Sequence, residues 1–119
     1  AIRVLAAGAL SGSAQRHPLA AQSVAPITSG SDLSEDAARS QAFQWLIDEG
    51  YTPTLVEAAI RFAISKAEVS TTLVGISSME QLEQAVASAD KGPLPAEALA
   101  RLPAVWASFA AGASQIFAE

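Results

Sequence analysis

Apolar residues recur at helical spacing along much of the chain, and this periodicity predicts most of its elements. In the first such stretch, Phe43, Leu46 and Ile47 share one face of a predicted helix. Ser34 is the expected N-cap, because a hydroxyl there can accept a hydrogen bond from a free backbone N–H of the first turn. Gly50 is expected to end the helix as the residue after its C-cap.

A second helix is predicted directly after Gly50, with Thr52 as N-cap and Pro53 as first helical residue. Its apolar positions form two adjoining stripes. An apolar face of this width predicts burial against both a sheet and neighbouring helices. The stripes consist of Leu55, Ala59, Phe62 and Ala63, and of Val56, Ile60 and Ile64.

A third helix is predicted from the spacing of Ser77 and Glu80, which fits a capping box. Gly92 and Pro93 are expected to end it. One apolar stripe runs along this helix, with acidic residues beside it. The stripe consists of Met79, Leu82, Val86 and Ala89.

Proline residues divide the C-terminal part of the chain. Pro95 is expected to start a short helix over residues 96–102, and Pro103 to break or kink it. An Ala-rich helix over residues 104–117 is expected to follow. Its possible anchors are Trp106, Phe109, Ile116 and Phe117.

Two short apolar runs, residues 2–6 and 71–74, are predicted to be parallel strands, although the shortness of the first leaves a helix open. Between them, residues 11–33 are rich in Ser, Gly and Pro and are read as a long loop. Alternating strands and helices favour a parallel α/β sheet. Two parallel strands leave unpaired edges, so we expect the chain to be part of a larger α/β architecture.

Composition excludes several functional classes. The 119 residues carry seven basic and twelve acidic side chains, without a Lys or Arg run, so nucleic-acid binding is not expected. No apolar run reaches the length of a membrane span. The absence of Cys excludes disulfides and thiolate metal sites, and no metal site is predicted.

The junction after the second apolar run could bind an anion. Gly75 allows a ligand to approach the backbone, Ser77 offers a hydroxyl, and the following helix directs free N–H groups at the turn. Gln81 and Gln84 carry amides that can hydrogen-bond a ribose or an adenine edge. No Lys or Arg is within reach in the sequence. The alternative is purely structural: Gly75 makes a turn and Ser77 caps a helix.

Two stretches of the chain, "IRVLAAGALSG" and "TPTLVEAAIRFAISKAEVSTTLVGISSMEQLEQAVAS", together resemble the end of an aldo-keto reductase. In the first, Leu5, Gly8, Leu10 and Gly12 match the pattern of that family's seventh barrel strand. The second is similar to the family's last helix, strand and loop. The resemblance covers about residues 1–92. It implies the C-terminal part of an eight-stranded α/β (TIM) barrel, mostly helical by residue count and with two short parallel strands. Residues 1–92 would form the last two βα units and residues 93–119 a helical tail.

The resemblance implies a partial site for NADP or NAD. Leu5 and Ala6 would line the path of the pyrophosphate, and the loop from Ser11 onward would fold over the cofactor. The adenosine phosphate would meet Gly75, Ile76 and Ser77. Gln81 and Gln84 would face that phosphate or the adenine.

Departures from the family pattern affect cofactor preference and catalysis. Ile76 and Gln81 stand where many NADPH-preferring members have Lys and Arg, so NAD use becomes plausible. The family's tetrad of Asp, Tyr, Lys and His lies on earlier strands, so no catalytic residue is predicted here. His17 is read as a solvated loop residue, and Tyr51 as a contact between two helices.

Two functional readings follow. The first is a portion of an NAD(P)-dependent oxidoreductase, cytoplasmic and inactive alone, whose partners are the nicotinamide cofactor and either the missing N-terminal part of the barrel or a second copy. The second is a non-enzymatic helical interaction module, with Trp45 and Trp106 as possible anchors.

Overall fold

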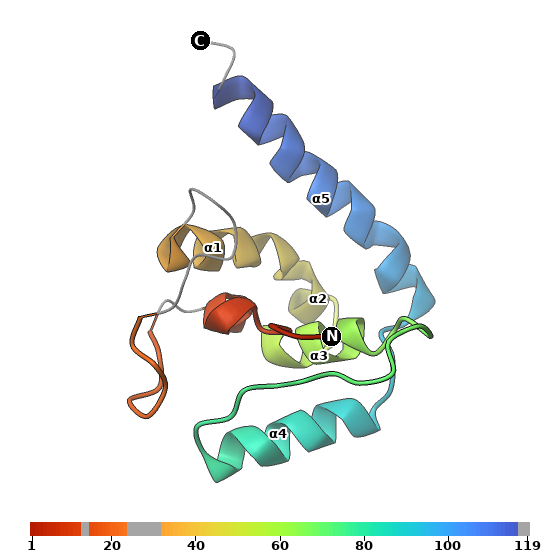
Figure 1. The fold of residues 1–119 in the computed structure, drawn as a ribbon. Coiled ribbons are helices and arrows are strands. Elements are labelled where there is room, and N and C mark those ends of the chain that lie inside the picture. Colours follow the sequence, from red (N-terminus) through yellow and green to blue (C-terminus); the bar gives the residue numbers. More distant parts are fainter. Residues whose placement is uncertain (13–14, 24–31, 117–119) are drawn as a thin grey trace.

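The computed structural model describes residues 1–12, 15–23 and 32–116, and every regular element in these ranges is a helix (Figure 1). The first part of the long helix α5 packs against α2 and α3, and α3 and α4 contact each other. The elements are η1 (Ala6–Ser11), α1 (Leu33–Ser40), η2 (Gln41–Phe43), α2 (Trp45–Asp48), α3 (Leu55–Ala63), α4 (Met79–Asp90) and α5 (Ala96–Ile116).

The strand predicted over residues 2–6 is wrong. Arg3 and Ala6 have φ values of 55° and 50°, and Ala7 has 56°, whereas strand residues require φ near −120°. Residues from Ala6 onward instead form the 3₁₀ element η1, which ends at Gly12 with φ of 79°. A short apolar run has no intrinsic preference strong enough to stay extended without strands beside it.

The second predicted strand, residues 71–74, is also not a regular strand, but it keeps one feature of a parallel pair. The amino group of Ala1 donates to the carbonyl of Thr71, and the amide of Leu73 donates to the carbonyl of Ala1 over 2.9 Å. One residue bonding to the two neighbours of Thr72 in this way is the repeat of a parallel ladder. The start of the chain and the segment over residues 71–74 therefore pair as predicted, but only through Ala1.

The second and third predicted helices are present with displaced caps, whereas the first, predicted between Ser34 and Gly50, is divided into α1, η2 and α2. Helix α1 begins after Asp32, whose side chain accepts from the amide of Glu35 in a capping box, so the N-cap is not Ser34. Thr54 rather than Thr52 caps α3. Ser78 caps α4 and accepts from the amide of Gln81, so the predicted box of Ser77 and Glu80 is wrong by one residue.

The core lies where α2, α3 and α5 meet. Leu46, Ala58 and Ala98 are buried there, one from each helix. Further along α5, the ring of Phe109 packs edge-on against Phe43 and that of Trp106 against Phe62.

Helix α5 continues through Pro103, so the predicted break at that residue is wrong. Leu102, directly before the proline, is buried with Leu94 and Ala98. Tertiary packing of this face stabilises the helix against the lost backbone hydrogen bond. Phe117, a predicted anchor, lies outside the described residues.

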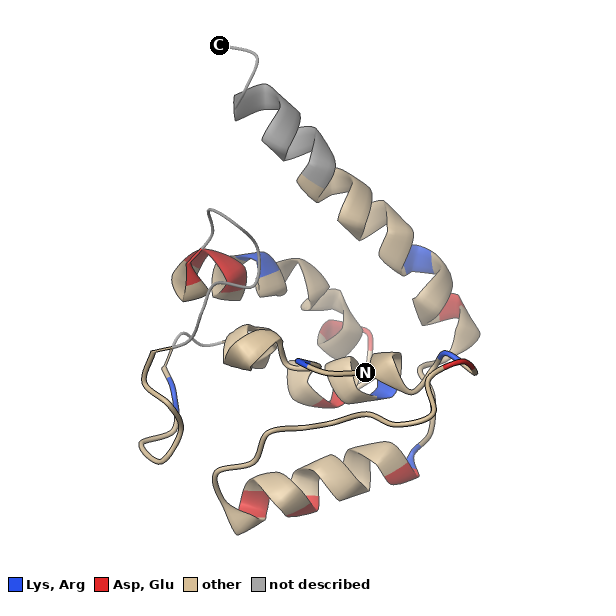
Figure 2. Cartoon of the chain, in the orientation of Figure 1, with Lys and Arg blue, Asp and Glu red and all other residues tan. Residues whose placement is uncertain are grey.

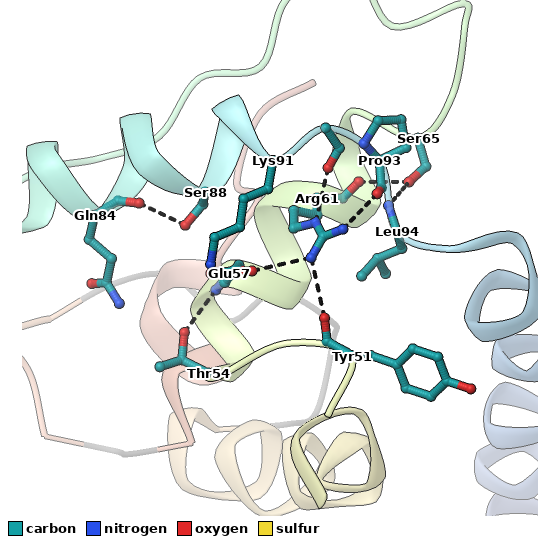
Figure 3. A network of polar contacts seen from close by, with 11 residues as sticks. Tyr51, Thr54, Glu57, Arg61, Ser65, Gln84, Ser88, Lys91, Pro93 and Leu94 are labelled. Atoms are coloured by element: carbon teal, nitrogen blue, oxygen red, sulfur yellow. Dashed lines mark hydrogen bonds and ion pairs between the residues drawn. The ribbon is translucent and has the colours of Figure 1, made fainter. Parts of the chain in front are cut away.

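A buried ion-pair network joins α3 to the segment between α4 and α5 (Figure 3). The carboxylate of Glu57 lies 3.2 Å from Arg61 and 2.7 Å from the ammonium of Lys91. Arg61 also donates to the carbonyl oxygens of Tyr51, Gly92 and Pro93 at 3.2, 3.0 and 2.9 Å. The network fixes the C-terminal end of α4 against α3.

A surface cluster connects α5 to the end of α2. The guanidinium of Arg101 forms two hydrogen bonds to Glu49, at 2.5 and 2.9 Å, and lies 4.0 Å above the ring of Trp45. Tyr51 packs edge-on against Trp45 at 5.8 Å between ring centres, as expected for a contact between helical segments. The hydrogen bond to Arg101 lowers the pKa of Glu49, and a hydrogen bond to Glu97 raises the pKa of Tyr51.

Candidate functional site

A cavity of about 810 Å³ lies between the N-terminal segment, the loop over residues 15–21, helix α3 and the turn that leads into α4. Its walls are apolar at Leu5, Val56 and Ile60, and polar groups from Ser77 and Gln84 converge on it. This size and this mixture of apolar walls with a few polar groups are typical of small-molecule sites.

The structure brings the predicted site residues together around this cavity. Leu5, from the N-terminal segment, lines it together with residues 75–77 of the turn. Gln81 and Gln84 line it from α4. Ala6 does not line the cavity, whereas its neighbour Ala7 does. Segments about 70 positions apart in the sequence thus meet at one site.

The turn before α4 is ordered by its own hydrogen bonds. The amide of Ser77 donates to Oε1 of Gln81 over 2.7 Å, and the amide of Gln81 donates to Oγ of Ser78 over 3.2 Å. Two N–H groups that the sequence offered to an anion are therefore already bonded. Since Oε1 of Gln81 accepts from Ser77, its Nε2 group is the part that can donate to a ligand.

Neither the backbone conformation nor the neighbouring atoms require a glycine at position 75. The φ of Gly75 lies outside the left-handed region, and a Cβ built on it would meet no atom within 4 Å. By contrast, Gly50 and Gly92 have φ values of 79° and 75°, which disfavour other residues. The absence of a side chain at Gly75 thus leaves open space beside the cavity.

Two arginines reach the cavity, contrary to the expectation that none is near. Arg3 and Arg16 both line it. Arg16 donates to the carbonyls of Ala7 and Ala21, the latter over 2.5 Å, and so ties its loop to η1. Sequence reasoning missed Arg16 because it stands in an irregular stretch whose path no periodicity predicts.

His17 is a partly exposed loop residue, as expected, and it also lines the cavity. Its Nδ1 accepts the amide of Leu19 over 3.2 Å, which in a neutral ring places the proton on Nε2. The carbonyl of His17 accepts from the side chain of Gln22 over 3.1 Å. The ring is thus held by a local turn of its own loop.

Outside this cavity, the described residues offer few alternatives. None of them forms a group of three or more His, Cys, Asp and Glu able to hold a metal ion. A smaller apolar cavity of about 130 Å³ lies beside the core, between Leu10, Leu55 and Trp106. Among the helices described, none is long and apolar enough to cross a bilayer.

Comparison with known proteins decides the family. The model of the aldo/keto reductase family matches residues 1–107. The chain belongs to this family. No curated protein and no solved structure matches the chain. The family match confirms the resemblance found in the sequence. Aldo-keto reductases fold as α/β barrels and are oxidoreductases that generally use NAD(P)H. The regular strands of such a barrel do not appear in the described part of this chain.

Proposed function

We propose that this chain carries part of the nicotinamide-dinucleotide site of an aldo-keto reductase, and that the cavity binds the ADP half of NAD or NADP. The observation that carries the proposal is Gly75: it lines the cavity, and neither its backbone conformation nor its neighbours require a glycine. A glycine of this kind suits close approach of a ligand to the backbone. A purely structural turn would not need it.

Each wall of the cavity has a role in this proposal. Leu5 and Ala7 border the pyrophosphate, whereas Ala6 between them does not line the cavity, and the guanidinium of Arg16 balances the pyrophosphate charge. The turn at Gly75, Ile76 and Ser77 meets the adenosine phosphate. Nε2 of Gln81 and the amide of Gln84 donate to the ribose or adenine. The bound cofactor would supply the hydride, and these residues bind and orient it.

In this proposal, the site does not strictly require NADP and can also accept NAD. Ile76 and Gln81 bring no positive charge to the adenosine end of the site. A 2′-phosphate is a dianion that Arg or Lys binds best. NAD use is therefore compatible with the site, and a cation introduced at position 81 should shift the preference towards NADP.

The chain is proposed to be inactive by itself. It contains no residue assigned to proton donation, because the family's catalytic tetrad lies on strands that precede this stretch. Its partners in this proposal are the cofactor and either the N-terminal part of a barrel or a second copy, in a cytoplasmic setting. The proposed domain division is residues 1–92 for the last βα units and 93–119 for the tail.

A second candidate function is a non-enzymatic interaction module. The observation that favours it is the exposure of large apolar side chains, including Trp106 at 45%. Patches of this kind mark contact surfaces. Dinucleotide binding separates the two candidates, because only the first requires it.

The test is a titration of the chain with ADP-ribose, in which binding is measured by calorimetry and by amide chemical shifts. Gly75→Val should lower the affinity at least tenfold, because its side chain enters ligand space, while thermal stability changes little. Gly92→Ala is the matched control: it should lower stability, because φ is positive there, and leave the affinity of the folded protein unchanged. Equal affinity of the Gly75→Val variant and the wild type would refute the proposal.

A further inference from the structure

The smaller cavity, of about 130 Å³, lies between α3 and α5 and is distinct from the proposed dinucleotide site. Helix α3 divides the two cavities, because its two adjoining apolar stripes line different ones. Val56 and Ile60 line the larger cavity, whereas Leu55, Ala59 and Phe62 line the smaller one. No described residue lines both. The smaller cavity is therefore a separate feature of the fold.

The walls of this smaller cavity offer almost nothing to a polar ligand. Among the described residues that line it, none is charged, and Trp106 alone carries a polar side-chain atom. Within the described part of α5, charged side chains stand only at Glu97 and Arg101, near the start of the helix (Figure 2). Arg101 is paired with Glu49 on the surface. A charged ligand in this cavity would therefore lose hydration without gaining a counter-ion.

The volume of the smaller cavity fits a single ring. An apolar cavity of roughly 150 Å³ with walls of Leu, Ile and Phe stays dry and binds benzene or xenon. The cavity here is of similar size, and Leu55, Leu94 and Leu102 contribute aliphatic walls. Water gains little from entering such a space, because a buried water needs several polar partners. A small apolar molecule is therefore the favoured occupant.

Aromatic side chains give this cavity a preference among apolar molecules. Phe43, Phe62 and Trp106 line it. Trp106 packs edge-to-face on Phe62, with 5.9 Å between ring centres and 71° between the ring planes. Phe43 contacts Phe109 in the same way at 6.1 Å. An aromatic ring placed among these side chains can form further edge-to-face contacts, whereas a saturated ring has no π-system with which to form them.

Helix α5 provides a route into the smaller cavity. Trp106, one of its walls, is 45% exposed, so the cavity borders solvent on this side. Pro103, one turn earlier, has no backbone N–H and cannot donate to the carbonyl of Leu99. Helices bend most readily at proline. A bend at Pro103 would widen the gap between Trp106 and α3 and admit a ligand.

From these observations we infer a second ligand site, in which the cavity between α3 and α5 binds an uncharged aromatic molecule of one ring. Such a molecule matches the volume of the cavity, brings no charge into it, and packs edge-to-face on Phe43, Phe62 and Trp106. This inference goes beyond dinucleotide binding. Its test contains no nucleotide, so either proposal can fail without the other.

The probe is fluorobenzene, whose binding to the 119-residue chain is measured by fluorine NMR relaxation and by methyl chemical shifts of the protein. Binding should be saturable, with shifts at Leu55 and Leu102 but not at Val56 and Ile60, which line the larger cavity. Cyclohexane has a similar size but no π-system and should bind about threefold more weakly. Benzoate should bind about tenfold more weakly, because its charge finds no partner.

Substitutions inside the smaller cavity test its location. Ala59→Leu should fill the space and weaken fluorobenzene binding at least tenfold. Ala87→Leu is the matched control, because it makes the same exchange at an exposed position of α4, and it should leave binding unchanged. Leu102→Ala supplies an independent result if Ala59→Leu prevents folding: it enlarges the cavity and should shift the preference from fluorobenzene towards fluoronaphthalene.

Four outcomes would overturn the inference. They are equal affinity of the Ala59→Leu variant and the wild type for fluorobenzene, methyl shifts in the larger cavity instead of the smaller one, binding of benzoate as tight as that of fluorobenzene, and binding of cyclohexane as tight as that of fluorobenzene. The last result would show that the cavity does not select aromatic rings.

Discussion

At the scale of single residues, Glu57 combines deep burial with two positively charged partners. It is 5% exposed and contacts Arg61, whose side chain is itself 11% exposed. Glu57→Ala would leave the Arg61 charge buried without its counter-ion, so we expect the free energy of unfolding to fall by about 3–5 kcal/mol. Urea unfolding followed by circular dichroism measures this loss.

Lys91→Met is the control for that prediction, because Lys91 is half exposed and its ion pair is solvated. Its cost should be about 0–1 kcal/mol. Equal losses in the two variants would show that burial of Arg61 is not the cause.

The pair of Glu49 and Arg101 predicts a pH effect with a defined sign. Because the hydrogen bond to Arg101 lowers the pKa of Glu49 in the folded state, the pair contributes stability above the ordinary carboxylate range. That contribution is lost as pH falls through the lowered value. Arg101→Met should raise the pKa of Glu49 in an NMR titration, and Arg39→Met, at a residue paired with Asp36 instead, should not.

Several residues that line the candidate site could be named from single residues and their neighbours in the sequence. Gly75, Ser77 and Gln81 belong to one turn and the start of one helix, so local rules reach them. Arg16 could not be found in this way, because its contact with the cavity depends on the path of an irregular loop. Ala6 was misplaced for a related reason: positive φ values at Ala6 and Ala7 turn the chain where a strand was expected.

At the scale of elements, the register of the α4 cap gives a prediction. Ser78 accepts the amide of Gln81, so Ser78→Ala should lower the free energy of unfolding by about 0.5–2 kcal/mol. Ser77→Ala should change it by less than about 0.5 kcal/mol, because Ser77 is not the N-cap. Thermal unfolding of the two variants compares them directly, and a larger loss for Ser77→Ala would place the cap at Ser77 after all.

Helices and strands differed in how far the sequence could predict them. A helix satisfies its backbone within itself, so the stripes of α3 and α4 were sufficient to find them, and only the caps were displaced. A strand depends on partners at its edges. Residues 2–6 and 71–74 carry apolar patterns compatible with strands, yet only Ala1 pairs with the second run, and regular strands do not follow.

At the scale of the whole molecule, helix α4 carries both a wall of the larger cavity and an exposed apolar stripe. The cavity is bordered by α3, the N-terminal segment and the turn before α4. The stripe of Met79, Leu82 and Val86 is exposed along the same helix. A candidate ligand site with an exposed apolar surface behind it is compatible with part of an α/β barrel.

This arrangement predicts that the 119-residue chain alone does not transfer hydride. Carbonyl reduction needs a proton donor at the oxygen as the hydride arrives at carbon, and a nicotinamide held tightly against the substrate. The proposed roles of Gly75, Gln81 and Arg16 concern only the ADP half of the cofactor. NADH and NADPH oxidation with a panel of aldehydes should therefore equal that of a heat-denatured sample. Mixing the chain with an N-terminal half-barrel of an aldo-keto reductase should raise the rate, and Leu82→Ser should reduce that gain. Turnover by the pure chain would contradict the prediction and require a proton donor among its own residues.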